Sequence, residues 1–85
     1  MTNDNSRQAI APLDLLILLA RIGPVHHEQF RLFEDHEDIH ITKAALRVLT
    51  RRGWLHEGIL HSWVTTEAGR TKAQQLIDGY AVRGA

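Results

Sequence analysis

The sequence predicts a small, mainly α-helical domain with one β-hairpin. Stretches with apolar residues at helical spacing recur along the chain, and proline, threonine or glycine stands at their ends. After the third stretch, strand-forming residues flank a Glu-Gly pair that suits a hairpin turn. Since 85 residues make one domain at most, we expect a single folded unit, 11–82, behind a flexible polar tail at 1–10. Its expected elements are helices at about 12–22, 25–34, 42–52 and 66–80 and a hairpin at about 54–65.

The first helix is expected to start at Pro12, where a missing N–H does no harm, and to stop before Gly23-Pro24. Asp14 and Arg21 are its only charged residues, so it lacks the polar face of a surface helix. Because a domain of this size cannot easily enclose such a helix, we expect it to contact a second subunit, together with the last helix. The residues expected at this dimer interface are Leu13, Leu15, Leu16, Leu19, Leu76, Ile77 and Tyr80.

The second helix is expected to begin directly after a tight turn. One stripe of the segment 25–34 holds Val25, Gln29, Phe30 and Phe33. The residues that follow have a poor helical pattern. Ile39 and Ile41 alternate with His40, which indicates a connector or a short strand.

The third helix has a clear start, a clear end and two different sides. Thr42 is a good N-cap, and Gly53 suits the left-handed position after the last turn. At about 100° per residue, the apolar residues share one side of the helix and the polar and basic residues share the other. The apolar side holds Ala45, Leu46 and Leu49, and the outer side holds Lys43, Arg47, Thr50 and Arg51.

The hairpin and the last helix follow in close succession. The expected strands are 54–57 and 59–65, joined at Glu57-Gly58. Thr66 then caps the last helix, in which Gly69 slightly weakens the first turn. The apolar stripe of this helix is formed by Ala73, Leu76, Ile77 and Tyr80.

The formal net charge is zero, but the two halves of the chain differ. Residues 1–40 hold three Arg against seven Asp and Glu, a net charge of −4, and residues 41–85 hold seven Lys and Arg against three acids, a net charge of +4. One interpretation is a basic face that attracts a polyanion, and the other is that the halves neutralise each other across the fold.

The absence of cysteine excludes disulfides and thiolate metal sites. The apolar run 13–20 is shorter than the ~20 residues that span a bilayer, and no cleavage site of a signal peptide follows it. We therefore expect a cytoplasmic protein without a membrane partner. No catalytic motif, phosphate loop or cofactor signature is present, so we expect neither enzymatic activity nor a cofactor.

Three helices, a hairpin and a further helix, with "AALRVLTRRGWL" before the hairpin and "WVTTEAGR" at its end, resemble the winged helix-turn-helix domains of bacterial regulators of the PadR and MarR type. The resemblance covers about Pro12 to Tyr80. It implies that Thr42–Arg52 is a recognition helix for the DNA major groove. The sequence departs from the family pattern at the hairpin, where Glu57-Gly58 stands in place of arginine or lysine. We therefore expect no minor-groove contact from the hairpin.

The resemblance also implies which side chains meet DNA. Residues near the start of a recognition helix usually reach the bases, so Thr42, Lys43 and Arg47 are expected at base edges. Thr50 is a further exposed side chain of this helix, and Arg51 and Arg52, which lie further along it, are expected to meet the DNA backbone. Arg70 and Lys72 open the last helix, where they either hold a phosphate or are solvated surface charges.

The expected function is a small sequence-specific DNA-binding regulator, a repressor that binds a palindromic operator as a homodimer. The first alternative is a winged-helix module or phage-type inhibitor that binds a protein and not DNA. The acidic run 34–38 suits this alternative if it is a protein-binding patch, or it is a solvated turn. The second is a metal-responsive regulator that uses His36 and His40, which would share one face of a helix although no recognised zinc spacing is present.

Overall fold

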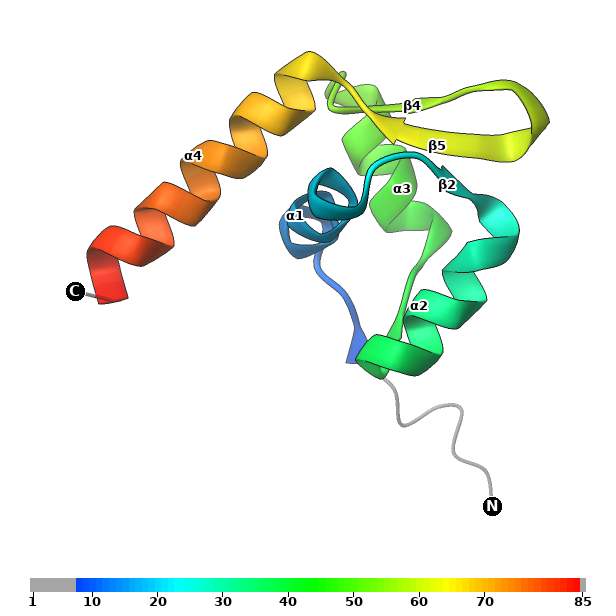
Figure 1. Cartoon of the computed structure of the whole chain (residues 1–85), viewed down its shortest axis with the longest axis horizontal. Coiled ribbons are helices and arrows are strands. Elements are labelled where there is room, and N and C mark those ends of the chain that lie inside the picture. The colour runs from blue at the N-terminus through cyan, green and yellow to red at the C-terminus, as the bar shows by residue number, and fades with distance from the viewer. Residues whose placement is uncertain (1–7, 85) are drawn as a thin grey trace.

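The computed structural model describes residues 8–84, with side chains described as far as residue 80. It is mainly helical and contains a small antiparallel sheet, which confirms the expected class (Figure 1). The helices are α1 (Pro12–Ile22), α2 (Phe30–Glu37), α3 (Lys43–Arg51) and α4 (Glu67–Gly84). The strands are β1 (Gln8–Ala9), β2 (Val25–His26), β3 (Ile39–His40), β4 (Leu55–Glu57) and β5 (Ser62–Thr65). Two single 3-10 turns span His27–Gln29 and Ile59–His61.

The antiparallel sheet has three strands in the order β2-β5-β4. β4 and β5 form the predicted hairpin, in which Leu55 lies opposite Thr65 and Glu57 lies opposite Trp63. β2 pairs with the other edge of β5, with Val25 opposite Trp63. β2 precedes α2 and β4 follows α3. The α2–α3 pair is therefore connected to the sheet at the start of α2 and at the end of α3 (Figure 1).

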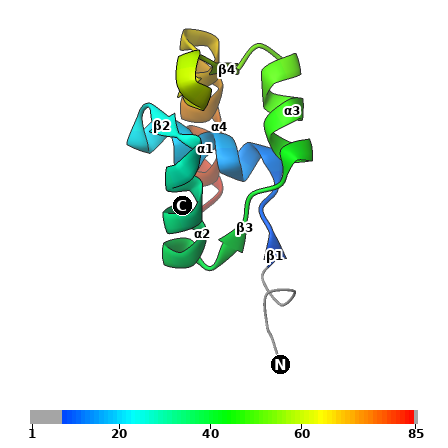
Figure 2. The same cartoon turned by 90° about the vertical axis from the view of Figure 1, so that its right-hand side faces the viewer.

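A second, parallel pair of strands joins the beginning of the described chain to the segment between α2 and α3. Figure 2 shows β1 beside β3, and in this pair Gln8 lies opposite Ile39 and Ala9 opposite His40. The Ile10 amide then donates to the carbonyl of His40 at 3.0 Å. The expected tail at 1–10 therefore ends earlier, because residues 8–10 are held by backbone hydrogen bonds; residues 1–7 lie outside the described residues.

The core lies around α1, which packs against α3, α4 and β5. Leu15, Leu16 and Leu19 are almost completely buried there. The prediction that these three leucines form a dimer interface is therefore wrong, because neighbours from the same chain already cover them. Leu13 is partly exposed, so only the outer side of α1 remains open. The other buried apolar residues are Val25, Ile41, Ala45, Leu46, Leu49, Leu55 and Ala73.

The second helix begins and ends later than 25–34, since α2 spans Phe30–Glu37. Val25 and His26 are drawn into the sheet by their pairing with β5. The His26 amide donates to the Gln29 side-chain oxygen at 2.8 Å, which stabilises the 3-10 turn between β2 and α2. The apolar stripe thus identified a buried face but not the conformation of its first residues. The short strand at Ile39 is confirmed.

The hairpin turn does not lie at Glu57-Gly58. The strands separate after Glu57, and Ile59–His61 make the turn, with the Ser62 amide bonded to the carbonyl of Ile59. Gly58 remains extended and donates to the carbonyl of Ser62 at 2.7 Å. The predicted turn is therefore displaced toward the C-terminus, and two apolar residues occupy the tip.

The predicted helix ends are mostly confirmed. Pro12 opens α1, and the Thr66 hydroxyl accepts the Gly69 amide at 3.0 Å at the start of α4. Gly53 has the left-handed φ of 80° expected after α3. α4 continues through Gly79 to Gly84, beyond the expected end at 80, and its far end points away from the sheet (Figure 1). None of the described helices is both long and apolar enough to cross a membrane.

Candidate nucleic-acid interface

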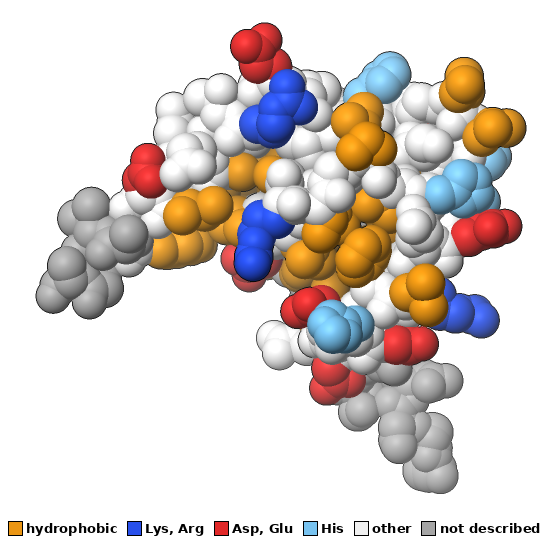
Figure 3. Space-filling model, viewed as in Figure 1, with side chains coloured by type: hydrophobic (Ala, Val, Ile, Leu, Met, Phe, Trp, Pro, Cys, Tyr) orange, Lys and Arg blue, Asp and Glu red, His pale blue; other side chains and the backbone are white. Residues whose placement is uncertain are grey.

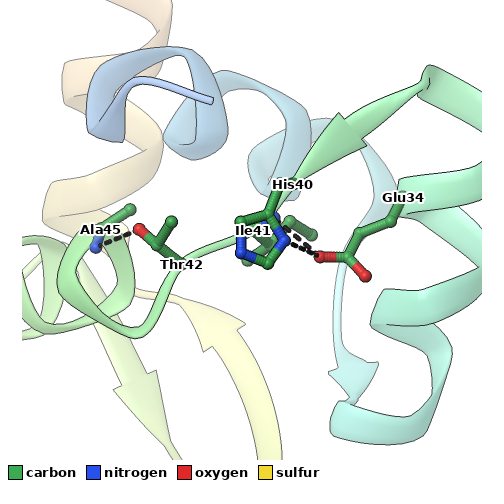
Figure 4. Close-up of polar contacts among 5 residues, drawn as sticks. All are labelled: Glu34, His40, Ile41, Thr42 and Ala45. Carbon is green, nitrogen blue, oxygen red and sulfur yellow. Dashed lines mark hydrogen bonds and ion pairs between the residues drawn. The ribbon is translucent and has the colours of Figure 1, made fainter. Parts of the chain in front are cut away.

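The turn between α2 and α3 is held by one carboxylate. Glu34 Oε2 accepts the backbone amide of Ile41 at 2.8 Å and contacts His40 Nδ1 at 3.2 Å (Figure 4). One residue later, the Thr42 hydroxyl accepts the amide of Ala45 at 3.0 Å and so caps α3. These contacts fix where α3 starts relative to α2. The hydroxyl of Thr42, which was expected at a base edge, is engaged in capping.

α3 presents a basic outer side, as the sequence predicts. Ala45, Leu46 and Leu49 are buried, whereas Lys43 and Arg47 are exposed one turn apart. Thr50 lies on the same side, and its hydroxyl donates to the carbonyl of Leu46 at 2.8 Å. Two cations at i and i+4 on an exposed helix side repel each other slightly, so their spacing does not stabilise the helix. They are available to an anionic partner.

A groove of about 730 Å³ lies between this side of α3, the helix α2 and the hairpin. Its apolar part comes from residues that also pack on the core: Phe30, Ile41, Leu46 and Trp63. Its cations are Arg31, Lys43 and Arg47, and its carboxylates are Glu34 and Glu57. Three cations against two carboxylates leave the groove with an excess of positive charge beside its apolar lining. The cations suit contacts with phosphate.

The other predicted DNA-binding cations lie outside this groove. Arg52 and Lys72 gather on the ring of Trp54, with the Arg52 guanidinium carbon at 5.6 Å and Lys72 Nζ at 5.5 Å from its centroid. This cation–π contact joins the end of α3 to the start of α4. Arg70 donates from Nη1 to the carbonyl of Thr65 at 2.8 Å, so its first role is to brace the end of β5. Arg51 is exposed on α3.

The sequence did not single out Arg31, Ile59 or Leu60. Arg31 lines the groove only because the Glu34 turn brings α2 beside α3. The sequence predicts that Ile59 and Leu60 belong to a strand, whereas the structure places them at the exposed tip of the hairpin. A pair of adjacent apolar residues next to a hairpin glycine was the available signal for such a tip.

The two histidines considered as metal ligands do not share a face. His36 is in α2 and lies 3.8 Å from Glu37, whereas His40 is in β3 and contacts Glu34. Within residues 8–84, no three His, Asp or Glu side chains come together in a way that could hold a metal ion.

Comparison with known proteins does not assign the chain to a family. No protein-family model, curated protein or solved structure matches it.

Proposed function

We propose that the chain is a small DNA-binding regulator with a winged helix-turn-helix fold. α2 and α3 form the helix-turn-helix pair, the β4–β5 hairpin is the wing, and β2 completes the sheet. In such pairs the second helix enters the major groove. The observation that carries the proposal is the exposed, basic outer side of α3, where Lys43 and Arg47 stand one turn apart above a buried apolar side.

In this proposal each cation has its own role. Arg47, near the middle of α3, reads a guanine through its forked guanidinium, and Lys43 holds a phosphate as a point charge. Arg52 and Lys72, gathered on Trp54, meet the backbone beside the end of α3. Arg31 on α2 faces the phosphates across the groove from Arg47.

The regulator acts as a homodimer on a palindromic site. A two-fold axis would place two copies of α3 about 34 Å apart, one helical turn of DNA. The predicted interface residues that lie in the core are not accessible to a second subunit. Of the others, Leu13 of α1 and Ile77 and Tyr80 of α4 are exposed, and Leu76 is half-buried. Occupying the operator is sufficient for repression.

The experiment is selection of bound sites from random double-stranded DNA with the purified chain, followed by titration of the selected site at several salt concentrations. Arg47→Ala is expected to weaken binding roughly tenfold or more and to relax preference at one position. Lys43→Ala is expected to weaken all sites alike and to reduce the salt slope by about 1. Arg21→Ala, at the end of α1, removes the same charge outside the groove and is the matched control.

The alternative is a protein-binding module that does not engage DNA, and the two carboxylates in the groove favour it. Glu34 and Glu57 border the same groove as Lys43 and Arg47, and both would lie near phosphates. If no site is enriched, and DNA retention at low salt is the same for Arg47→Ala and Arg21→Ala, the DNA-binding proposal fails and the protein-binding alternative becomes the leading one.

A further inference from the structure

The tip of the β4–β5 hairpin is apolar and open to solvent. Ile59 is 84 % exposed and Leu60 is 76 % exposed, more than any other large hydrophobic residue in the described part of the chain. Figure 3 shows hydrophobic side chains at this outer end of the hairpin. Burying both side chains in a partner would be favourable, because removing aliphatic surface from water stabilises the buried state.

The tip is also held in a conformation that its residues disfavour. Leu60 has φ 57° and ψ 32°, and His61 has φ 56°, so both central residues of the turn are left-handed. Asn-Gly is the usual pair in such a turn, because the Cβ of a bulky residue crowds the backbone in the left-handed conformation. The turn is closed by the Ser62 amide bonded to Ile59 and by His61 Nδ1 at 3.1 Å from the Glu57 carboxylate. Strain of this kind concentrates at functional sites.

The charge around the tip argues against a polyanion as its partner. No lysine or arginine occurs between Gly53 and Gly69, and Glu57 is the charged residue nearest the tip. DNA phosphates and anionic membrane surfaces attract basic segments and repel carboxylates. The partner that fits is a protein surface with an apolar hollow and a positive edge.

The chain itself carries such a surface. The groove beside α3 is lined by the apolar residues Phe30, Leu46 and Trp63 and by three cations, Arg31, Lys43 and Arg47, against two carboxylates, Glu34 and Glu57. Its apolar residues match the aliphatic side chains of the tip, and its excess of cations attracts the Glu57 carboxylate of an incoming tip. Its volume of about 730 Å³ exceeds what two aliphatic side chains fill, so it also admits the turn backbone.

We propose that the groove receives the hairpin tip of a second copy of this chain. Glu57 and His61, beside the tip, already border the groove of their own chain. A two-fold axis next to the tip therefore brings each tip to the partner's groove, and the contact is self-complementary. The hairpin and α4 leave the core on different sides, so this contact is separate from the dimer surface of Ile77 and Tyr80 (Figure 1).

The contact covers Lys43, Arg47 and Thr50, which are the side chains proposed to meet DNA. Self-association and DNA binding are then mutually exclusive, and the fraction of chain able to bind DNA falls as its concentration rises. This regulatory consequence, unlike the contact itself, rests on the proposed function.

Disulfide trapping tests the contact directly, because the natural chain contains no cysteine. One chain carries Ile59→Cys and a second, differently tagged chain carries Thr50→Cys, whose position lines the groove. Mild oxidation is expected to join them, since a bridge forms only when the Cα atoms come within about 7 Å. Ala44→Cys, exposed on the same helix but outside the groove, is the matched control. Equal trapping at positions 44 and 50, or none at position 50, overturns the proposal.

Leu60→Asn separates self-association from folding. Asparagine accepts the left-handed conformation better than leucine, so Tm is expected to stay the same or rise. Self-association is measured by sedimentation in a chain whose Ile77→Ser and Tyr80→Ser changes remove the proposed α4 contact, and there it is expected to weaken roughly tenfold or more. Leu32→Asn, at an exposed leucine of α2 outside the groove, is expected to leave self-association unchanged. Unchanged association in Leu60→Asn overturns the proposal. Neither test contains DNA, so failure of the DNA-binding proposal leaves both results interpretable.

Discussion

The Glu34 carboxylate accepts the backbone amide of Ile41 at 2.8 Å, across the turn from α2 to α3. Ile41 is a core residue, so this single bond ties the outer helix α2 to the buried start of the α3 segment. His40 Nδ1 contacts the same oxygen at 3.2 Å. Through these two contacts the carboxylate joins α2 to the segment that leads into α3.

Removing the carboxylate is expected to destabilise the fold. Glu34→Ala leaves the part-buried Ile41 amide without its acceptor, and we expect the free energy of unfolding to fall by about 1–2 kcal/mol. Glu34→Gln retains an acceptor oxygen and is expected to lose less than half of that. Urea denaturation of the two variants and the natural chain measures the difference. Equal losses in both variants would assign the effect to charge and not to the hydrogen bond.

Two glycines of α4 are expected to respond to alanine in opposite ways. A Cβ at Gly69 would overlap the carbonyl oxygen of Trp54 and press on the Thr65 methyl, so Gly69→Ala is expected to cost about 1–3 kcal/mol. A Cβ at Gly79 meets nothing within 4 Å, so Gly79→Ala is expected to stabilise the helix by up to ~1 kcal/mol. Thermal unfolding distinguishes them, and a stabilising Gly69→Ala would contradict the close approach of α4 to Trp54.

Thr42 is expected to act through folding more than through DNA contact. Its hydroxyl caps α3, so Thr42→Ala is expected to lower the free energy of unfolding by about 1 kcal/mol. Thr42→Ser keeps the capping oxygen and is expected to restore stability. Circular dichroism during denaturation checks this. A Thr42→Ala chain that is as stable as the natural chain but binds DNA more weakly would indicate that Thr42 contacts a base.

Substitution of the buried leucines of α1 is expected to lower stability, whereas substitution of the exposed apolar residues of α4 is expected to weaken self-association. Leu16 is fully buried, so Leu16→Ala is expected to lower the free energy of unfolding by about 2–5 kcal/mol. Tyr80 is 50 % exposed, and Ile77→Ser with Tyr80→Ser is expected to dissociate the proposed α4 dimer with little change in the unfolding of the monomer. Sedimentation and denaturation at matched concentrations, in a chain that also carries Leu60→Asn, measure both. A variant at these positions that remains dimeric places the subunit contact elsewhere.

Local signals in the sequence were sufficient for α1, α3 and the start of α4. Pro12, Thr42 and Thr66 mark helix starts because a missing N–H or a side-chain oxygen acts on its own first turn. The apolar side of α3 follows in the same way, since helical periodicity alone assigns Leu46 and Leu49 to one side. For the same reason Lys43 and Arg47 were recognised together.

Features that depend on distant parts of the chain were not predictable in this way. Val25 belongs to a strand and not to a helix because β5 offers it a partner. Gln8 and Ala9 are ordered by β3, which lies some thirty residues further on. Leu15, Leu16 and Leu19 looked like interface residues because a helix that is apolar all round does not reveal which neighbours cover it.

By itself, the sequence determined the starts of α1, α3 and α4, the amphipathic third helix and the presence of a hairpin, since each depends on interactions within a few residues. The tertiary structure decided which leucines are core, where the hairpin turns, and that Arg31, Lys43 and Arg47 border one groove. Those outcomes depend on pairing and packing between segments far apart in the chain. The spacing of residues within one segment does not predict which distant segments it will contact.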